Sequence, residues 1–396
     1  MKKLAVKPAS TSFSVIKPID PVRLTQDLVR CRSVTPQDEG ALDIVTENLN
    51  SMGFTVHPLR FEEEGTDPVD NIFARLGTEG PHLSFLGHTD VVPSGPVEDW
   101  KFPPFDAVIE NGVLYGRGSA DMKGCVAAFV AATSRFLTNK TSFKGSISLL
   151  ITGDEEGRSI NGTAKVIEWM KDKNHIPDVA LVGEPSNAYE MGQTIRIGRR
   201  GSFNALLTVR GIQGHSAYPE RADNPILKMM KILDILSHTE LDTGTDEFPP
   251  SHLVISSVDV GNPAPNIIPA RATALINIRF NRLWNAEVLE DRLRDIIASS
   301  GIAYELKTWC TAESFMTEDG DWLQLVSQAV KKTSDRWPFP DTGGGTSDAR
   351  FIAPYCPVVE YGLLNKTIHQ VDERIALSDL EVLTQTYYEV LQSYFA

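Results

Sequence analysis

The sequence predicts an α/β protein with a mostly parallel central sheet and a second, smaller domain inserted into the first. Two observations support this fold class. From residue 83 onward, short apolar runs alternate with helical spacing, which is typical of parallel sheets. Between about residues 202 and 309 the pattern changes to β-α-β-β-α-β, the ferredoxin-like order. At roughly 150 residues per domain, 396 residues suffice for two or three domains.

In the larger domain, polar residues follow the apolar runs. Helical spacing is seen at 22–52 and in the Ala-rich segment after Lys123. The runs at 83–86, 147–152 and 179–182 lead, respectively, into His88, into Glu155 and Glu156, and into Glu184. Because the carboxyl ends of parallel strands share one edge of a sheet, we expect these side chains to converge.

The inserted domain is expected to contain strands at 203–210, 253–260, 272–280 and 303–309, with helices at 225–237 and 287–299. Helical spacing then returns at 322–334 and 377–394. We therefore expect a loose extension at 1–18, a main domain of 19–201 and 310–396, and an inserted domain of 202–309.

Composition favours small-molecule chemistry. A net charge of -14 repels a phosphate backbone, so we expect no nucleic-acid partner. No apolar run is long enough to cross a bilayer, and we expect no membrane partner. The four cysteines are scattered without a CxxC pair, which favours reduced thiols and a cytoplasmic location. The first eighteen residues lack an apolar signal core, so we expect no secretory signal, although a weak organellar address stays open.

His88 and Asp90 form the first candidate pair of site residues. A histidine at a strand end is more often structural than a metal ligand. A carboxylate two residues further on favours the metal interpretation, because a metal-bound imidazole usually donates its other N–H to such a group.

Asp121 lies in Gly-Arg-Gly-Ser-Ala-Asp, which is a poor dinucleotide fingerprint because an aspartate replaces the third glycine. A carboxylate on a tight glycine-rich turn can bridge two cations about 3.5 to 4 Å apart. The alternative is an ordinary helix N-cap.

Glu155, Glu156, Glu184 and His369 complete the candidate set. Neighbouring side chains on an extended or turning backbone point in different directions, so one glutamate can bind metal while the other accepts a proton. Surface exposure is the alternative for adjacent glutamates. Two histidines and three carboxylates suit zinc, with cobalt or manganese as substitutes.

Five motifs together resemble the dizinc M20 metallohydrolases, over nearly the whole chain from Pro21 to Phe395: GHTDVV at 87–92, LYGRGSADMKG at 114–124, GDEEG at 153–157, VGEP at 182–185 and TIH at 367–369. Four further motifs resemble the branch formed by the bacterial succinyl-diaminopimelate desuccinylases: GRRGSF at 198–203, QGHSAYPE at 213–220, PNIIPA at 265–270 and TGGGTSDARF at 342–351.

The resemblance implies a zinc-peptidase-like catalytic domain that holds two Zn²⁺ per subunit, with Co²⁺ as a possible substitute. His88 and Glu184 would bind one ion, Glu156 and His369 the other, and Asp121 would bridge them. Glu155 would be the general acid/base, with Asp90 supporting the site. The family also implies a cis peptide bond after the bridging aspartate, here Asp121–Met122.

For the inserted domain, the resemblance implies a dimerisation (lid) role in a homodimer. His215 would stabilise the oxyanion in the partner subunit's active site, and Asn266 would enter the same site. The implied substrate contacts are Arg199, Ser202, Tyr218, Asn266, Arg279, Gly345 and Thr346.

The implied reaction is hydrolysis of N-succinyl-LL-2,6-diaminopimelate to succinate and LL-2,6-diaminopimelate by a bridging water, in lysine and cell-wall precursor biosynthesis. Other M20 activities, such as acetylornithine deacetylation or dipeptide cleavage, are the nearest alternatives. A non-catalytic zinc-binding scaffold is a third.

Overall fold

The computed structural model describes residues 16–140 and 142–396, so most of the predicted extension at 1–18 lies outside the described residues. The chain divides into two compact units. Unit 1 runs up to Ile197 and also contains Thr317–Asp341 and Ser347–Ala396. Unit 2 comprises Gly198–Met316 and Thr342–Thr346. The predicted domain boundaries at 201/202 and 309/310 lie a few residues from the observed boundaries at 197/198 and 316/317. The prediction also placed the short segment 342–346 in the main domain, whereas this segment belongs to unit 2.

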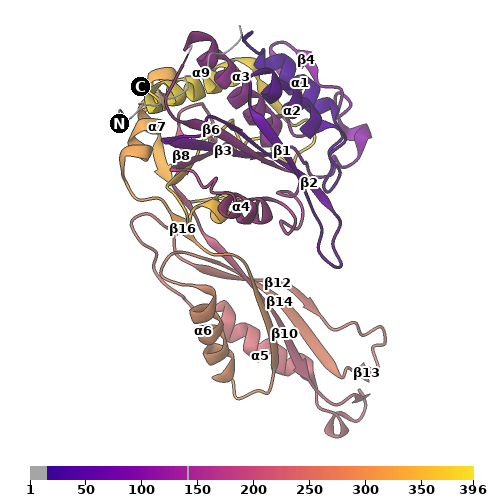
Figure 1. The fold of residues 1–396 in the computed structure, drawn as a ribbon. Coiled ribbons are helices and arrows are strands. Elements are labelled where there is room, and N and C mark those ends of the chain that lie inside the picture. Colours follow the sequence, from indigo (N-terminus) through magenta and orange to yellow (C-terminus); the bar gives the residue numbers. More distant parts are fainter. Residues whose placement is uncertain (1–15, 141) are drawn as a thin grey trace. The chain divides into compact units, whose positions relative to one another are not determined.

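Unit 1 is built on an eight-stranded sheet in the order β1-β2-β6-β3-β7-β18-β8-β17 (Figure 1). Its four central strands β6, β3, β7 and β18 pair in parallel, which confirms the predicted mostly parallel sheet. Every residue of β3 and β6 is buried, as expected for strands covered on both faces. The strand bounds are β1 Thr55–Phe61, β2 Val69–Leu76, β3 His82–His88, β6 Ser146–Thr152, β7 Val179–Val182, β8 Thr194–Arg196, β17 Phe339–Asp341 and β18 Val358–Glu360.

Helices cover both faces of this sheet. Figure 1 shows α1, α3 and α9 on one face and α4 on the other. Apolar packing fixes α3, because Phe129 stacks on Phe85 of β3 with ring centroids 4.2 Å apart. The helices are α1 Pro21–Arg30, α2 Ala41–Ser51, α3 Gly124–Asn139, α4 Thr163–Asp172, α7 Asp321–Ser334, α8 Ala349–Ile352 and α9 Leu377–Tyr394, with the single turns η1 Val97–Asp99 and η2 Ser119–Lys123. A small sheet joins β4 Val108–Glu110, β5 Val113–Tyr115 and β19 Arg374–Ala376.

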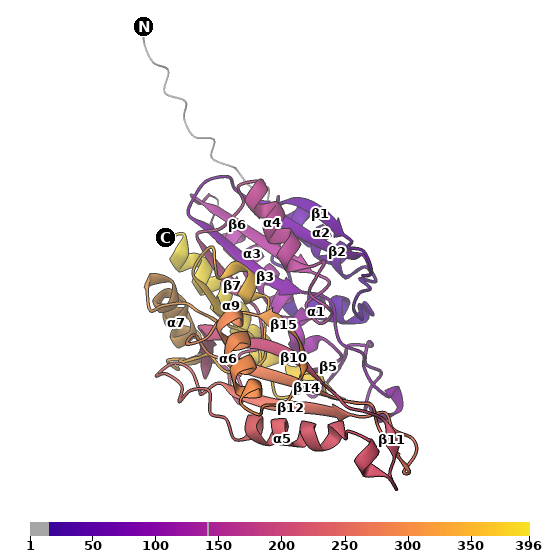
Figure 2. The same cartoon turned by 90° about the horizontal axis from the view of Figure 1, so that it is seen from below.

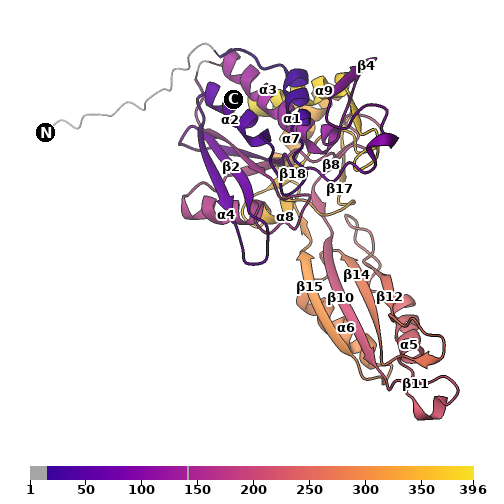
Figure 3. The same cartoon turned by 90° about the vertical axis from the view of Figure 1, so that its right-hand side faces the viewer.

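Unit 2 has the predicted β-α-β-β-α-β order. Its antiparallel sheet, in the order β12-β14-β10-β15, carries α5 and α6 on one face (Figures 2 and 3). Helix α5 spans Pro225–Ser237, as predicted, because Asn224 caps it and proline begins it. The other bounds are β10 Gly201–Arg210, β12 His252–Asp259, β14 Arg271–Phe280, α6 Ala286–Ala298 and β15 Glu305–Ala312.

Short pairings complete unit 2. Strand β11 Gly214–His215 pairs with β13 Ile267–Ile268, and the single turn η3 Pro219–Arg221 follows β11. Strand β9 Gly198–Arg199 pairs with β16 Phe315–Met316. Among the described residues of both units, no helix has the length and apolar character needed to cross a membrane.

Candidate metal centre

Three neighbouring strand ends in unit 1 deliver the candidate ligands. His88 is the last residue of β3, Glu155 and Glu156 follow β6, and Glu184 follows β7. The parallel register pairs His88 with Thr152, so β3 and β6 end at the same level. The strand ends therefore meet at one edge of the sheet, as the sequence predicted.

Asp121 and His369 come from two other segments. Asp121 lies in η2, and its peptide bond to Met122 is cis, as the family resemblance implied. Helix α3 begins only at Gly124, with Lys123 at the N-cap position, so Asp121 does not cap it. His369 lies in the loop between β18 and β19.

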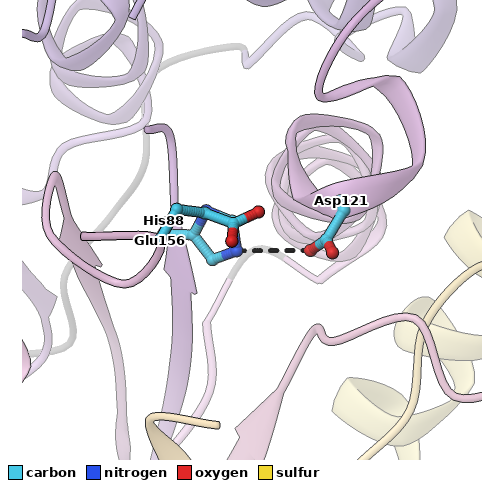
Figure 4. Close-up of side chains that lie close together, drawn as sticks. All are labelled: His88, Asp121 and Glu156. Atoms are coloured by element: carbon cyan, nitrogen blue, oxygen red, sulfur yellow. Dashed lines mark ion pairs between the residues drawn. The ribbon is translucent and has the colours of Figure 1, made fainter. Parts of the chain in front are cut away.

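The carboxylate of Asp121 lies between the two imidazoles. Its Oδ1 is 3.3 Å from Nε2 of His88, the contact drawn in Figure 4. Its Oδ2 is 3.5 Å from Nε2 of His369. One carboxylate therefore serves two histidines with its two oxygens, which is the arrangement a bridging ligand needs.

A further carboxylate joins each imidazole. Nε2 of His88 lies 3.6 Å from Oε1 of Glu184, and Nε2 of His369 lies 2.8 Å from Oε1 of Glu156. The carboxylate of Glu155 is on the side of His88, with Oε2 4.0 Å from Nε2. The two neighbouring glutamates thus face different ends of the centre.

Two buried polar atoms at the centre lack a hydrogen-bond partner: Nε2 of His88 and Oδ1 of Asp121. Buried groups of this kind are normally satisfied. Ligand atoms of His88, Asp121 and Glu156 lie within 4.8 Å of one another, and so do those of His88, Glu155 and Glu184. Imidazole nitrogens and carboxylate oxygens at these separations fit a pair of divalent cations such as zinc.

The electrostatics of the centre favour added positive charge. Hydrogen bonds to Asp121 and Glu156 raise the pKa of His369 to about 10. Burial and the nearby charge of Glu184 raise the pKa of Glu155 well above its ordinary value. Burial alone would raise the pKa of Asp121, but the neighbouring imidazoles of His369 and His88 lower it. The buried carboxylates therefore draw positive charge, which divalent cations bring.

Asp90 supports the centre in a different way from that predicted. Nδ1 of His88 donates to the backbone carbonyl of Asp90 at 2.9 Å, whereas the nearest carboxylate oxygen of Asp90 is 3.6 Å away. This bond leaves Nε2 of His88 facing the metal centre. The carboxylate of Asp90 instead accepts the backbone N–H groups of Glu155 at 3.3 Å and Glu156 at 3.1 Å.

Asp154 is a supporting residue for which the sequence indicated no separate role. Its carboxylate accepts the backbone N–H groups of Arg158, Ile160 and Asn161 at 2.8 to 3.0 Å. It therefore closes the loop that follows Glu155 and Glu156. Its position next to the two glutamates in Gly-Asp-Glu-Glu-Gly was the available signal.

The remaining predicted site residues lie in unit 2, in two groups. Around the start of β10, Ser202 pairs in register with Arg279 of β14, and Nη1 of Arg199 donates to the carbonyl of Gly345 at 3.1 Å. Thr346 follows directly in the same unit.

The second group surrounds β11 and β13. The rings of His215 and Tyr218 lie 5.8 Å apart, and the carbonyl of Asn266 accepts the backbone N–H of Ser216 at 2.9 Å. These segments lie beyond the opposite end of the β10–β14 ladder, where Arg210 pairs with Arg271. At ~3.3 Å per strand residue, roughly 25 Å separates the two groups.

A model of peptidase family M20/M25/M40 matches residues 84–393. The chain belongs to this family. It is 52% identical over 377 residues to a protein named succinyl-diaminopimelate desuccinylase from Rhodospirillum centenum, covering 95% of this chain and 98% of the relative. A protein of the same name from Beijerinckia indica subsp. indica is 49% identical, with 94% and 98% covered.

Solved structures share the fold at low identity. An M20 family metallo-carboxypeptidase, Sso-CP2 from Sulfolobus solfataricus, matches with a TM-score of 0.77 at 19% identity, covering 95% of this chain and 99% of that chain. The YXEP protein of Bacillus subtilis, described as a dinuclear metal binding peptidase of the M20 family, matches with a TM-score of 0.69 at 16% identity, covering 95% and 96%. These two likenesses support the fold assignment.

Proposed function

We propose that this protein hydrolyses the amide bond of N-succinyl-LL-2,6-diaminopimelate, releasing succinate and LL-2,6-diaminopimelate for lysine and cell-wall precursor synthesis. The observation that carries the hydrolytic function is the carboxylate of Asp121 between two imidazoles, each joined by a further carboxylate. The substrate follows from the two relatives at about half identity, whose whole length this chain nearly spans.

Two zinc ions, or cobalt as a substitute, fit the donor set of the centre. His88 and Glu184 would hold one ion and Glu156 and His369 the other, with Asp121 between them, because each imidazole lies beside the carboxylate that would share its ion. When bound, the ions supply an activated water and polarise the acyl carbonyl. Two imidazoles with carboxylates match the preference of zinc for nitrogen and oxygen ligands.

Glu155 is the proposed general acid/base. Its carboxylate lies 4.0 Å from Nε2 of His88, farther away than the carboxylates of Asp121 and Glu184. Its raised pKa suits a group that takes a proton from the attacking water and keeps it until the amide C–N bond breaks. The same proton then goes to the departing amine, so the carboxylate is regenerated.

Residues of unit 2 are the proposed substrate contacts. Arg199 and Arg279 suit the carboxylates of the substrate, because a guanidinium binds a carboxylate through two parallel hydrogen bonds. Ser202, Gly345 and Thr346 lie in the same group or next to it and complete this proposed set.

The second group of unit 2, with His215, Tyr218 and Asn266, is proposed to act in the active site of a partner subunit. Roughly 25 Å of strand separates it from the first group, which fits residues that serve another site. The homodimer would form through unit 2. Its edge strand β12 exposes Val254 and Val258, and helix α5 exposes Leu227 and Met230, each by 46% or more. In such a site, His215 would donate to the oxyanion.

We place the reaction in the cytoplasm, because all four cysteines are free in the described structure.

Comparative kinetics test the proposal. The purified zinc-loaded protein is assayed with N-succinyl-LL-2,6-diaminopimelate, N-acetylornithine and a dipeptide, and kcat/KM is compared. We expect the succinylated substrate to be preferred by at least about tenfold. A preference for N-acetylornithine or the dipeptide would assign another M20 activity, and no turnover of any of the three would favour a binding scaffold.

A further inference from the structure

A buried ion pair in unit 1 contacts the segments that carry the metal centre but contains none of the proposed ligands. Nη1 of Arg117 lies 2.7 Å from Oε2 of Glu373, and the two side chains are only 2% and 1% exposed. Removing two charges from water is costly unless their other hydrogen-bonding atoms also find partners. The partners of this pair therefore indicate what it does.

The carboxylate of Glu373 binds the backbone of the segment that carries Asp121. Its Oε2 accepts the N–H of Gly118 at 3.0 Å, and its Oε1 accepts the N–H groups of Ala120 at 2.9 Å and Asp121 at 3.2 Å. The backbone carbonyl of Glu373 also accepts the N–H of Gly116 at 2.9 Å. One side chain thus holds the peptide N–H of the proposed bridging residue itself.

The guanidinium of Arg117 binds the backbone of the loop that carries His369. It donates to the carbonyl of His369 at 3.4 Å, to that of Gln370 at 3.3 Å and to that of Pro93 at 3.4 Å. The ring of Trp100 lies 5.3 Å from its central carbon. His369 has a φ of 59°, in the left-handed region that side chains other than glycine rarely adopt, so donors at its carbonyl help to hold that conformation.

We propose that Arg117 and Glu373 are a positioning pair that sets the distance between His369 and Asp121, and with it the affinity for the metal ion held there. Each member binds the backbone of one of these two residues, and their ion pair joins the two segments. Nε2 of His369 lies 3.5 Å from Oδ2 of Asp121. The inference rests on the metal centre of the proposed function but not on the identity of the substrate.

Two conservative substitutions test the pair. In Glu373→Gln, one accepting oxygen becomes an amide N–H₂ group, which cannot accept the hydrogen bonds that the backbone N–H groups and Arg117 now donate. Arg117→Lys keeps the charge but loses the planar fork that reaches several carbonyls. The matched control is Glu381→Gln, which breaks the ion pair with Arg135 in unit 1, where Glu381 is 57% exposed.

Metal affinity is the decisive readout. Each full-length protein is stripped of metal and titrated with Co²⁺ by visible absorption, and zinc affinity is measured by competition with a chelating dye. His369→Ala identifies the spectral contribution of the ion at that residue. Loss of support for a ligand typically lowers metal affinity by about 10- to 100-fold, and we expect this loss for both test variants at the ion near His369. Excess metal should restore part of kcat.

A purely structural role predicts a different result. Both test variants would then melt at a lower temperature, yet their folded forms would bind cobalt as tightly as Glu381→Gln, and that outcome overturns the proposal. If Glu373→Gln does not fold, Arg117→Lys decides by the same criterion. If the unaltered protein hydrolyses no succinylated substrate, the proposed function fails, while the cobalt titration still decides the role of the pair.

Discussion

Replacing Gly362 by alanine tests how closely the backbone of unit 1 packs behind the metal centre. Gly362 lies just after β18, and its nearest neighbours are backbone atoms of Gly183 and Glu184. A Cβ at this position would lie 2.4 Å from the carbonyl oxygen of Glu184 and 2.5 Å from that of Gly183. Both neighbours are main-chain atoms, so neither can rotate away as a flexible side chain would.

The expected size of the effect follows from these distances. Ordinary contacts of a Cβ begin at 3.4 Å, so the carbonyl of Glu184 must retreat by about 1 Å. Overpacking of this kind destabilises proteins by about 1 to 3 kcal/mol. A misplacement of about 1 Å near reacting groups lowers rates about 100-fold. We therefore expect Gly362→Ala to lose both stability and turnover.

The assay compares Gly362→Ala with Gly320→Ala, in which the new Cβ has no neighbour closer than 3.9 Å and the backbone is extended, with a φ of -169°. Urea unfolding of the metal-free proteins reports the free energy of unfolding, and succinate release reports kcat/KM. Gly320 is the N-cap residue of α7, where glycine is preferred to alanine, so the control should lose about 1 kcal/mol or less and should keep its kcat/KM. Wild-type stability and kcat/KM in Gly362→Ala would refute the reasoning.

Three further predictions concern the base, pH and metal. Glu155→Ala should lose at least about 100-fold in kcat while zinc content and melting temperature stay unchanged, because the proton of the attacking water has no acceptor; undiminished turnover would exclude Glu155 as the base. Burial, together with Arg75 and His175, lowers the pKa of His82 to about 3. In the unfolded chain, this histidine binds a proton near pH 6.5, whereas the folded protein keeps it neutral down to about pH 3. Its pKa shift therefore costs no stability above pH 6.5, and the free energy of unfolding falls between pH 6.5 and 3 by at most ~1.4 kcal/mol per pH unit. Urea unfolding of His82→Gln should therefore lose less stability between pH 6.5 and 4 than the unaltered protein, and equal slopes would contradict this. Removal of metal by a chelator should abolish turnover and lower the melting temperature reversibly, since an ion at 100 times its Kd stabilises by about 2.7 kcal/mol; identical melting curves with and without zinc would show that no ion binds the folded state.

Local patterns were sufficient to predict much of the fold and the types of ligand. The mostly apolar runs before His88 and Glu184 are strands β3 and β7, because strands buried on both faces need no regular polar alternation. Helix α5 begins at its predicted residue, since an asparagine cap followed by proline is a short-range signal. The glycine-rich turn around Asp121 was likewise visible from its residues.

Other features had no local signal. The sequence suggested that the carboxylate of Asp90 would hold the imidazole of His88, but the backbone carbonyl of Asp90 does so at 2.9 Å. The segment 342–346 belongs to unit 2, where Thr342 donates to the carbonyl of Glu247, a residue 95 positions away. Both outcomes depend on which atoms packing brings together, and residue type alone does not determine that.

By itself, the sequence predicted the buried parallel strands that lead into the candidate ligands, the order of the main elements of unit 2 and the donor types of a candidate metal centre. These follow from side-chain periodicity, caps and turns, which act within a few residues of the chain. Only the tertiary structure decided that the two oxygens of Asp121 face two different histidines, and that Arg117 pairs with Glu373 across 256 positions. Contacts of that span arise when separate elements pack into one core, because the entropy lost on joining distant segments is offset only in the folded state.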